Sequence, residues 1–198
     1  NIENRALRGI DVEKIILASK SPRRKELFSL LSLDFEVITR DVPEDIDEKA
    51  LPEDSVLELA YSKAEAVFRE YKDRIVLGLD TLVYTDTRVF GKPKDAEDAK
   101  EILRYLSGKS HMVVTGVVIM SRAITKTFYT KTKVTFYSLS KDEIERYVAT
   151  GEQMDKAGAY AAQGYASRFI EKINGDFYTV VGMPLSKIYQ EFKELKII

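Results

Sequence analysis

The sequence contains no cysteine, no tryptophan and a single histidine, His111. The lack of cysteine excludes disulfides and thiol nucleophiles, and it also excludes the Cys/His ligand sets of zinc sites. A Ser-His-Asp triad would depend on His111, but the sequence has no G-x-S-x-G motif to supply its serine. We therefore expect catalytic acids, bases and metal ligands among the carboxylates, and a structural role for His111.

A large net charge and long apolar segments are also missing. The 31 basic and 32 acidic residues leave a net charge of −1, so no overall field attracts nucleic acid or an anionic membrane. No apolar run approaches the roughly 20 residues needed to span a bilayer. Residues 1–13 are polar and charged, without the pattern of a secretory signal, and a cytoplasmic protein is expected.

Strands and helices alternate in the first half of the chain, and strands pair locally in the second half. The predicted strands are 14–18, 35–38, 74–86, 88–90, 111–121, 123–139, 169–173 and 178–183. The predicted helices are 22–33, 54–71, 94–108, 140–151 and one that begins at Pro184. This mixture predicts an α/β fold, close to α+β, around one mixed sheet.

The charge at the start of the predicted helix 22–33 is unusual. Ser21 and Pro22 are typical residues for an N-cap and a first helical position. Arg23 and Arg24 follow, although a helix N-terminus already carries about half a positive charge. Free N–H groups at this end bind anions, and two guanidiniums suit a ligand with several negative charges, such as a triphosphate. An exposed basic turn is the alternative.

Two carboxylates are candidates for catalysis. Asp80 lies in the otherwise apolar strand 74–86, and a buried carboxylate is costly unless it is paired or bound to a metal. A structural aspartate bonded to nearby backbone is the alternative. Glu44 lies in an acidic loop, residues 41–53, where a solvated carboxylate is the simpler interpretation.

Two lysines and a glutamine are candidates for substrate contacts. Lys63 falls among the apolar positions of the helix 54–71, where its stem covers the edge of the core or carries the ammonium towards a phosphate. Lys92 follows a short strand and is either a phosphate contact or a turn lysine. The segment 150–164 is rich in small residues that allow a ligand close to the backbone, and its Gln163 amide can read a base edge. A tightly packed connection is the alternative there.

Five segments together resemble the Maf family of nucleoside triphosphate pyrophosphatases. They are SKSPRR (19–24), GLDTLV (78–83), GKPKDAEDAKEILRYLSGKSH (91–111), TGEQMDKAGAYAAQG (150–164) and INGDFYTVVGMPL (173–185). Their order and spacing match the family over residues 13–195, which implies one domain with two lobes around a central cleft. The implied fold is elongated and of the inosine-triphosphatase type, with a mixed, twisted sheet flanked by helices. Residues 1–12 form an N-terminal extension with no assigned role.

The resemblance also implies roles for particular residues. Those expected to hold the phosphates are Ser19, Ser21, Arg23 and Arg24. Those expected to line the catalytic cleft are Glu44, Lys63, Asp80 and Lys92. By the same resemblance, Gln163 would help to read the base, and Asp80 with Glu44 would hold a divalent cation, Mg²⁺ or Mn²⁺. Asp80 would act as general base on a water.

The implied reaction is hydrolysis of the α–β phosphoanhydride of a nucleoside triphosphate, giving a monophosphate and pyrophosphate. The arginine after SPR and the AYxxQG pattern at 159–164 are more similar to the subgroup that acts on dTTP and UTP. CTP and modified pyrimidine nucleotides are further candidate substrates. Two alternatives stay open: a nucleotide-binding regulator of cell division without turnover, and a phosphatase that removes only the terminal phosphate. No nucleic-acid or membrane partner is expected, and the resemblance allows a homodimer.

Overall fold

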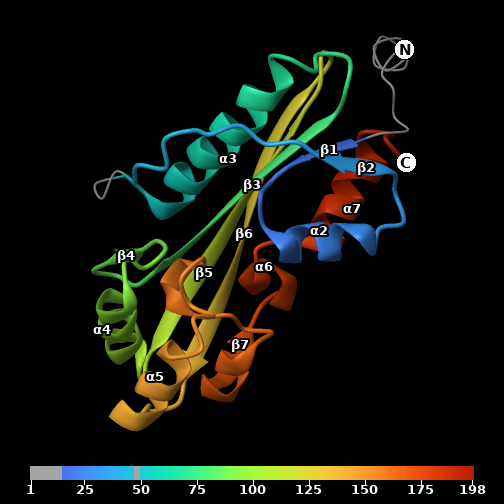
Figure 1. The fold of residues 1–198 in the computed structure, drawn as a ribbon. Helices are drawn as coiled ribbons and strands as arrows, with labels where there is room; N and C mark the ends of the chain where they lie inside the picture. Colours follow the sequence, from blue (N-terminus) through green and yellow to red (C-terminus); the bar gives the residue numbers. More distant parts are fainter. Residues whose placement is uncertain (1–14, 47–49) are drawn as a thin grey trace.

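The computed structural model describes residues 15–46 and 50–198. In this part of the chain, seven strands form one mixed sheet flanked by helices (Figure 1). The strands are β1 (Ile15–Ala18), β2 (Phe35–Val37), β3 (Val76–Tyr84), β4 (Val89–Phe90), β5 (Ser110–Met120), β6 (Thr125–Phe136) and β7 (Ile170–Asn174). Their order is β2-β1-β3-β5-β6-β7, with β4 paired to the end of β3. The first three strands are parallel and the later pairs are antiparallel, so the predicted mixed sheet is confirmed.

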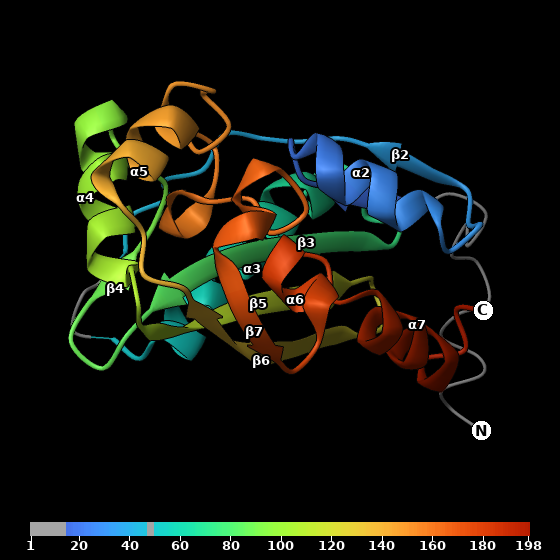
Figure 2. The ribbon, with the colours of Figure 1, turned by 90° about the horizontal axis from the view of Figure 1, so that it is seen from below.

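Helices cover both faces of the sheet (Figures 1 and 2). The helices are α2 (Pro22–Ser29), α3 (Pro52–Phe68), α4 (Ala96–Leu106), α5 (Lys141–Val148), α6 (Phe177–Val181) and α7 (Leu185–Glu194). α3 covers one face, and α2, α6 and α7 lie against the other. α4 and α5 lie at one end of the elongated molecule, and the long strands β5 and β6 connect that end to the other. Within the described ranges, no helix combines the length and the apolarity required to cross a membrane.

The central strands are buried on both faces. In β1, Ile15 and Leu17 pack in one hydrophobic cluster with Phe28, while Ile16 packs in another with Ala60 of α3. Because side chains alternate between the faces, a strand covered on both sides is apolar throughout. This explains why residues 15–18 form a continuous apolar run.

Helix α3 lies unusually close to the sheet because glycine occurs where it crosses β3 and β5. A Cβ added at Gly78 would lie 2.3 Å from the Ala60 carbonyl oxygen, and one at Gly116 would lie 2.8 Å from the Val56 oxygen. Neither position has room for a side chain. The close approach brings Lys63, which α3 carries, to the edge of β3.

One predicted strand is wrong. Residues 178–183 were expected to be extended, but most of them belong to the helix α6. The Asp176 carboxylate accepts hydrogen bonds from the N–H groups of Tyr178 and Thr179, and Gly182 ends the helix with φ 94°. A strong cap at each end therefore outweighs the strand preference of the tyrosine, threonine and valines between them.

Candidate active site

The candidate site is a cleft of about 480 Å³ beside a gap in the sheet. β1 pairs with β3 only as far as Gly78, and β4 pairs with β3 only from Val83 onwards. In the described part of the chain, no strand pairs with residues 79–82 on this side of β3. Asp80 lies in the middle of this gap and lines the cleft.

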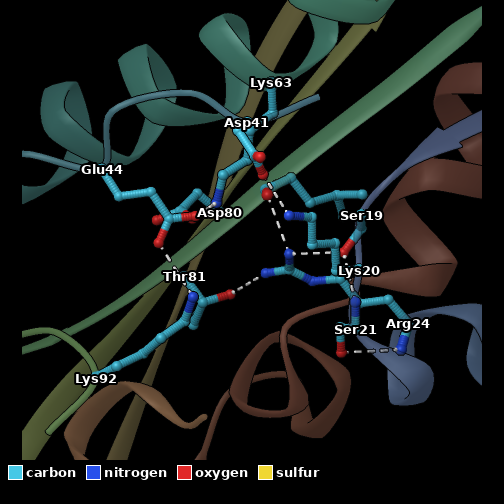
Figure 3. Close-up of polar contacts among 11 residues, drawn as sticks. Ser19, Lys20, Ser21, Arg24, Asp41, Glu44, Lys63, Asp80, Thr81 and Lys92 are labelled. Carbon is cyan, nitrogen blue, oxygen red and sulfur yellow. Dashed lines mark hydrogen bonds and ion pairs between the residues drawn. The ribbon is translucent and has the colours of Figure 1, made fainter. Parts of the chain in front are cut away.

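Two lysines and two carboxylates form a connected cluster in the cleft (Figure 3). Lys63 Nζ lies 2.5 Å from Asp80 Oδ1 and 2.9 Å from Glu44 Oε1. Lys92 Nζ lies 3.1 Å from the other Glu44 oxygen, Oε2. The sequence left open which way Lys63 points, and the structure directs its ammonium towards the carboxylates.

The two lysines of the cluster keep the Glu44 carboxylate charged. Burial opposes ionisation of Glu44, but hydrogen bonds from Lys63 and Lys92 outweigh it and lower the pKa of Glu44 to about 2. Glu44 is therefore a carboxylate at neutral pH. The Lys63 and Asp80 side chains are only 14% and 13% exposed, so their ion pair is largely shielded from bulk water.

The oxygen donors of Asp80 and Glu44 are suited to a hard divalent cation. Mg²⁺ is commonly bound by one or two carboxylates together with substrate phosphates. Among the residues that the structure describes, no group of three or more histidine, cysteine, aspartate or glutamate side chains is placed to hold a metal ion. The oxygen donors of Asp80 and Glu44 are compatible with a Mg²⁺ ion that is bound together with phosphate oxygens.

The start of α2 forms another wall of the cleft. Ser21 caps the helix, its Oγ accepting a hydrogen bond from the Arg24 N–H at 3.4 Å, and Ser19 Oγ accepts one from the Ser21 N–H at 3.3 Å. Arg23 Nη1 lies 3.9 Å from Asp155 Oδ2, on a segment far along the chain. Burial lowers the pKa of Arg23, although nearby carboxylates favour its charged form. The arginine remains a cation at any physiological pH.

Arg24 lies beside Arg23, but its guanidinium is directed towards the sheet (Figure 3). It donates to the carbonyl oxygens of Gly182, at 2.8 Å, and Leu79, at 3.0 Å. It also donates to Thr81 Oγ1 at 3.0 Å. The two adjacent arginines therefore lie in different environments.

Residues of the segment 155–163 also line the cleft, and its Asp155 lies close to Arg23 of α2. Gln163 is exposed and lines the cleft, as does Lys156, whose ammonium contacts the Asp155 carboxylate. Sequence reasoning assigned no separate role to Lys156 or to Thr81. Two features of the sequence could have indicated such roles. Lys156 is a lysine among small residues, and Thr81 carries a hydroxyl next to Asp80 in an otherwise apolar strand.

Comparison with known proteins identifies the family. The family model described as "Maf-like protein" matches residues 14–195. This chain belongs to the Maf family. Two Maf relatives are both named "dTTP/UTP pyrophosphatase". The one from Bacillus cytotoxicus is 50% identical over 183 residues, 92% of this chain and 96% of the relative. The one from Bacillus cereus strain G9842 is 48% identical over 186 residues, 94% and 97% of the two chains.

A solved structure shares the fold of this chain. The Ham1 protein of Staphylococcus aureus superposes with a TM-score of 0.52 at 16% sequence identity. The match covers 92% of this chain and 99% of the Ham1 chain. At this identity the likeness concerns the fold alone, and it agrees with the elongated α/β architecture.

The lining of the Maf cleft has an excess of positive charge. Its basic residues are Lys20, Arg23, Arg24, Arg40, Lys63, Lys92 and Lys156. Its acidic residues are Asp41, Glu44, Asp80 and Asp155. Seven cations against four carboxylates, in a chain with a net charge of −1, favour an anionic ligand at this place.

Proposed function

We propose that this protein hydrolyses dTTP and UTP to the nucleoside monophosphate and pyrophosphate, with CTP and modified pyrimidine nucleotides as further candidates. The observation that carries the proposal is the cluster of Asp80 and Glu44 with Lys63 and Lys92 at the gap in the sheet. Phosphoryl-group hydrolysis needs carboxylates to orient a water and cations to offset charge on the leaving group. The names of the curated relatives supply the substrates.

In the proposed mechanism, Asp80 orients the attacking water and accepts its proton. Glu44 remains ionised, because hydrogen bonds from Lys63 and Lys92 lower its pKa to about 2. When the triphosphate binds, both lysines are available to exchange carboxylate contacts for phosphate contacts and to stabilise the pyrophosphate leaving group. Mg²⁺ or Mn²⁺, held by Asp80 and Glu44, would supply charge neutralisation and a more acidic water.

The remaining substrate contacts are assigned to the two walls of the cleft. Ser21, with the Arg23 N–H at the start of α2, binds phosphate oxygens, because a helix N-terminus favours anions. Arg23 adds a guanidinium to this wall, and Ser19 shapes the turn through its hydrogen bond with the Ser21 N–H. Gln163, which also lines the cleft, reads the base through its amide.

Product analysis tests this function directly. Wild type is incubated with dTTP, UTP, CTP and 7-methyl-GTP in the presence of Mg²⁺ or Mn²⁺, and is compared with Asp80→Asn. We expect pyrophosphate and TMP or UMP from wild type, and a loss of about 100-fold or more in kcat for the variant, because a general base contributes about that much. Asp86→Asn is the matched control, since Asp86 is exposed in the turn after β3.

Two other outcomes would contradict the proposal. Tight binding of dTTP without turnover would indicate a nucleotide-binding regulator. Release of inorganic phosphate in place of pyrophosphate would indicate a phosphatase that removes the terminal phosphate. A homodimer remains a prediction from the family resemblance, and light scattering of the purified chain measures it.

A further inference from the structure

The gap beside β3 leaves backbone groups that a strand would otherwise pair. β1 ends its pairing at Ala18, opposite Gly78, and the next residue of β3 is Leu79. Arg24 Nη1 donates to the Leu79 carbonyl oxygen at 3.0 Å. The Arg24 guanidinium therefore supplies the hydrogen bond that a neighbouring strand would otherwise donate to the Leu79 carbonyl.

The other donors of Arg24 are occupied by the protein as well. Nε donates to the Gly182 carbonyl at 2.8 Å, Nη2 to Thr81 Oγ1 at 3.0 Å, and Nη1 also reaches Ser19 Oγ at 3.3 Å. Four of the five N–H donors of a guanidinium are therefore used within the protein. Gly182 permits this approach, since a Cβ there would lie 3.3 Å from Arg24 Nη2.

Thr81 extends this contact into a chain of hydroxyls across the sheet. Thr115 Oγ1 donates to the Thr179 carbonyl at 2.9 Å, and it lies 2.9 Å from Thr81 Oγ1. A hydroxyl has one proton, so Thr115 must accept from Thr81, and Thr81 in turn accepts from Arg24. Thr115 and Thr179 are fully buried, and the chain links α2, β3, β5 and α6.

We infer that Arg24 is a positioning residue that holds β3 on both sides of Asp80, and that it is not a ligand of the phosphates. Leu79 and Thr81 are the two neighbours of Asp80, and Arg24 bonds to both. This inference rests on the proposed function, because the expected effect of losing Arg24 is a misplaced Asp80, the carboxylate that accepts the proton of the attacking water. It replaces the expectation from the family resemblance that Arg24 joins Arg23 in holding phosphate.

The test is Arg24→Lys, which keeps the charge, but the three donors of an ammonium cannot serve four acceptors that lie in different directions. Steady-state kinetics with dTTP, inhibition by pyrophosphate and equilibrium binding of dTTP in Ca²⁺ are measured for each protein. We expect kcat to fall at least about 10-fold, while KM, the inhibition constant and the dissociation constant change less than about 3-fold. Arg69→Lys, on the exposed end of α3, is the matched control and is expected to behave as wild type.

The opposite pattern overturns the inference. If kcat stays within about 3-fold of wild type, or if dTTP and pyrophosphate bind at least about 10-fold more weakly, Arg24 acts as a substrate ligand or has no part in the reaction. Failure of the proposed function is a separate result, because it is seen in wild type as an absence of pyrophosphate. The binding measurement still decides in that case whether Arg24 contacts the nucleotide.

A second variant covers the case in which Arg24→Lys does not fold. Thr81→Val keeps the shape of the side chain and the guanidinium charge, but it removes the oxygen that accepts from Arg24 Nη2. We expect kcat to fall at least about 3-fold with dTTP binding unchanged. A wild-type kcat in a folded Thr81→Val protein, confirmed by circular dichroism, contradicts the inference.

Discussion

Lowering the pH from 7 to 5 should destabilise this protein through one buried side chain, His111. The imidazole is 2% exposed, and its Nε2 lies 2.8 Å from the Tyr160 hydroxyl. The Phe136 ring packs edge-on against it, with centroids 4.9 Å apart. Burial lowers the pKa of His111 from 6.5 to about 4, because the cation would lose its hydration without gaining a charged partner.

The size of the effect follows from proton linkage. In the unfolded chain the imidazole takes up a proton near pH 6.5, whereas in the folded protein it does so only near pH 4. The stability contributed by neutral His111 is therefore complete above pH 6.5 and is lost as the pH falls towards 4. Between pH 7 and pH 5 the free energy of unfolding should decrease by about 2 kcal/mol from this group.

Urea unfolding of wild type and His111→Gln at both pH values measures this contribution. Glutamine retains a polar group near Tyr160 but does not titrate. Between pH 7 and pH 5, the free energy of unfolding of His111→Gln should therefore decrease by about 2 kcal/mol less than that of wild type. As His111 is the only histidine, its imidazole NMR signals are unambiguous. The reasoning is refuted if both proteins lose equal stability, or if the folded wild type titrates near pH 6.5.

Two further predictions concern the close packing of α3 and the start of α2. Gly78→Ala places a methyl group 2.3 Å from the Ala60 oxygen, so it should lower the free energy of unfolding by about 2 kcal/mol or more. Gly78→Ala should also lower kcat, since α3 carries Lys63. Unchanged urea unfolding would contradict the expected loss of stability. Arg23→Ala should raise the KM for dTTP at least about 10-fold with little change in Tm, because its charge serves the substrate. A large fall in Tm with normal turnover would count against that role.

Much of the secondary structure was predictable because it depends on near neighbours. The capping box at the start of α5 is one case: Ser140 Oγ accepts from the Glu143 N–H, and the Glu143 carboxylate accepts from the Ser140 N–H. The two residues are three positions apart, so the pattern is visible in the sequence. The helix α6 was missed because its Tyr-Thr-Val-Val sequence favours a strand, and the caps that decide its structure lie outside those four residues.

The candidate site was only partly predictable. Asp80 was recognisable as a carboxylate in an apolar strand, and this rests on the cost of burying an unpaired charge. The direction of Lys63 stayed open, because a lysine at the edge of a helix can reach water or a buried partner. The fold decides it by bringing Glu44 and Asp80 to the same ammonium.

The sequence by itself determined the α/β class, most strands and helices, and the start of α2 with its excess of basic residues. These features follow from side-chain periodicity and from caps within a few residues of each other. Only the tertiary structure shows that Arg23 and Arg24 have different partners. Two of the acceptors of Arg24 are Leu79, 55 positions away, and Gly182, 158 positions away. Local sequence cannot reveal such partners, because they come together only when β3 and the turn after α6 pack against α2.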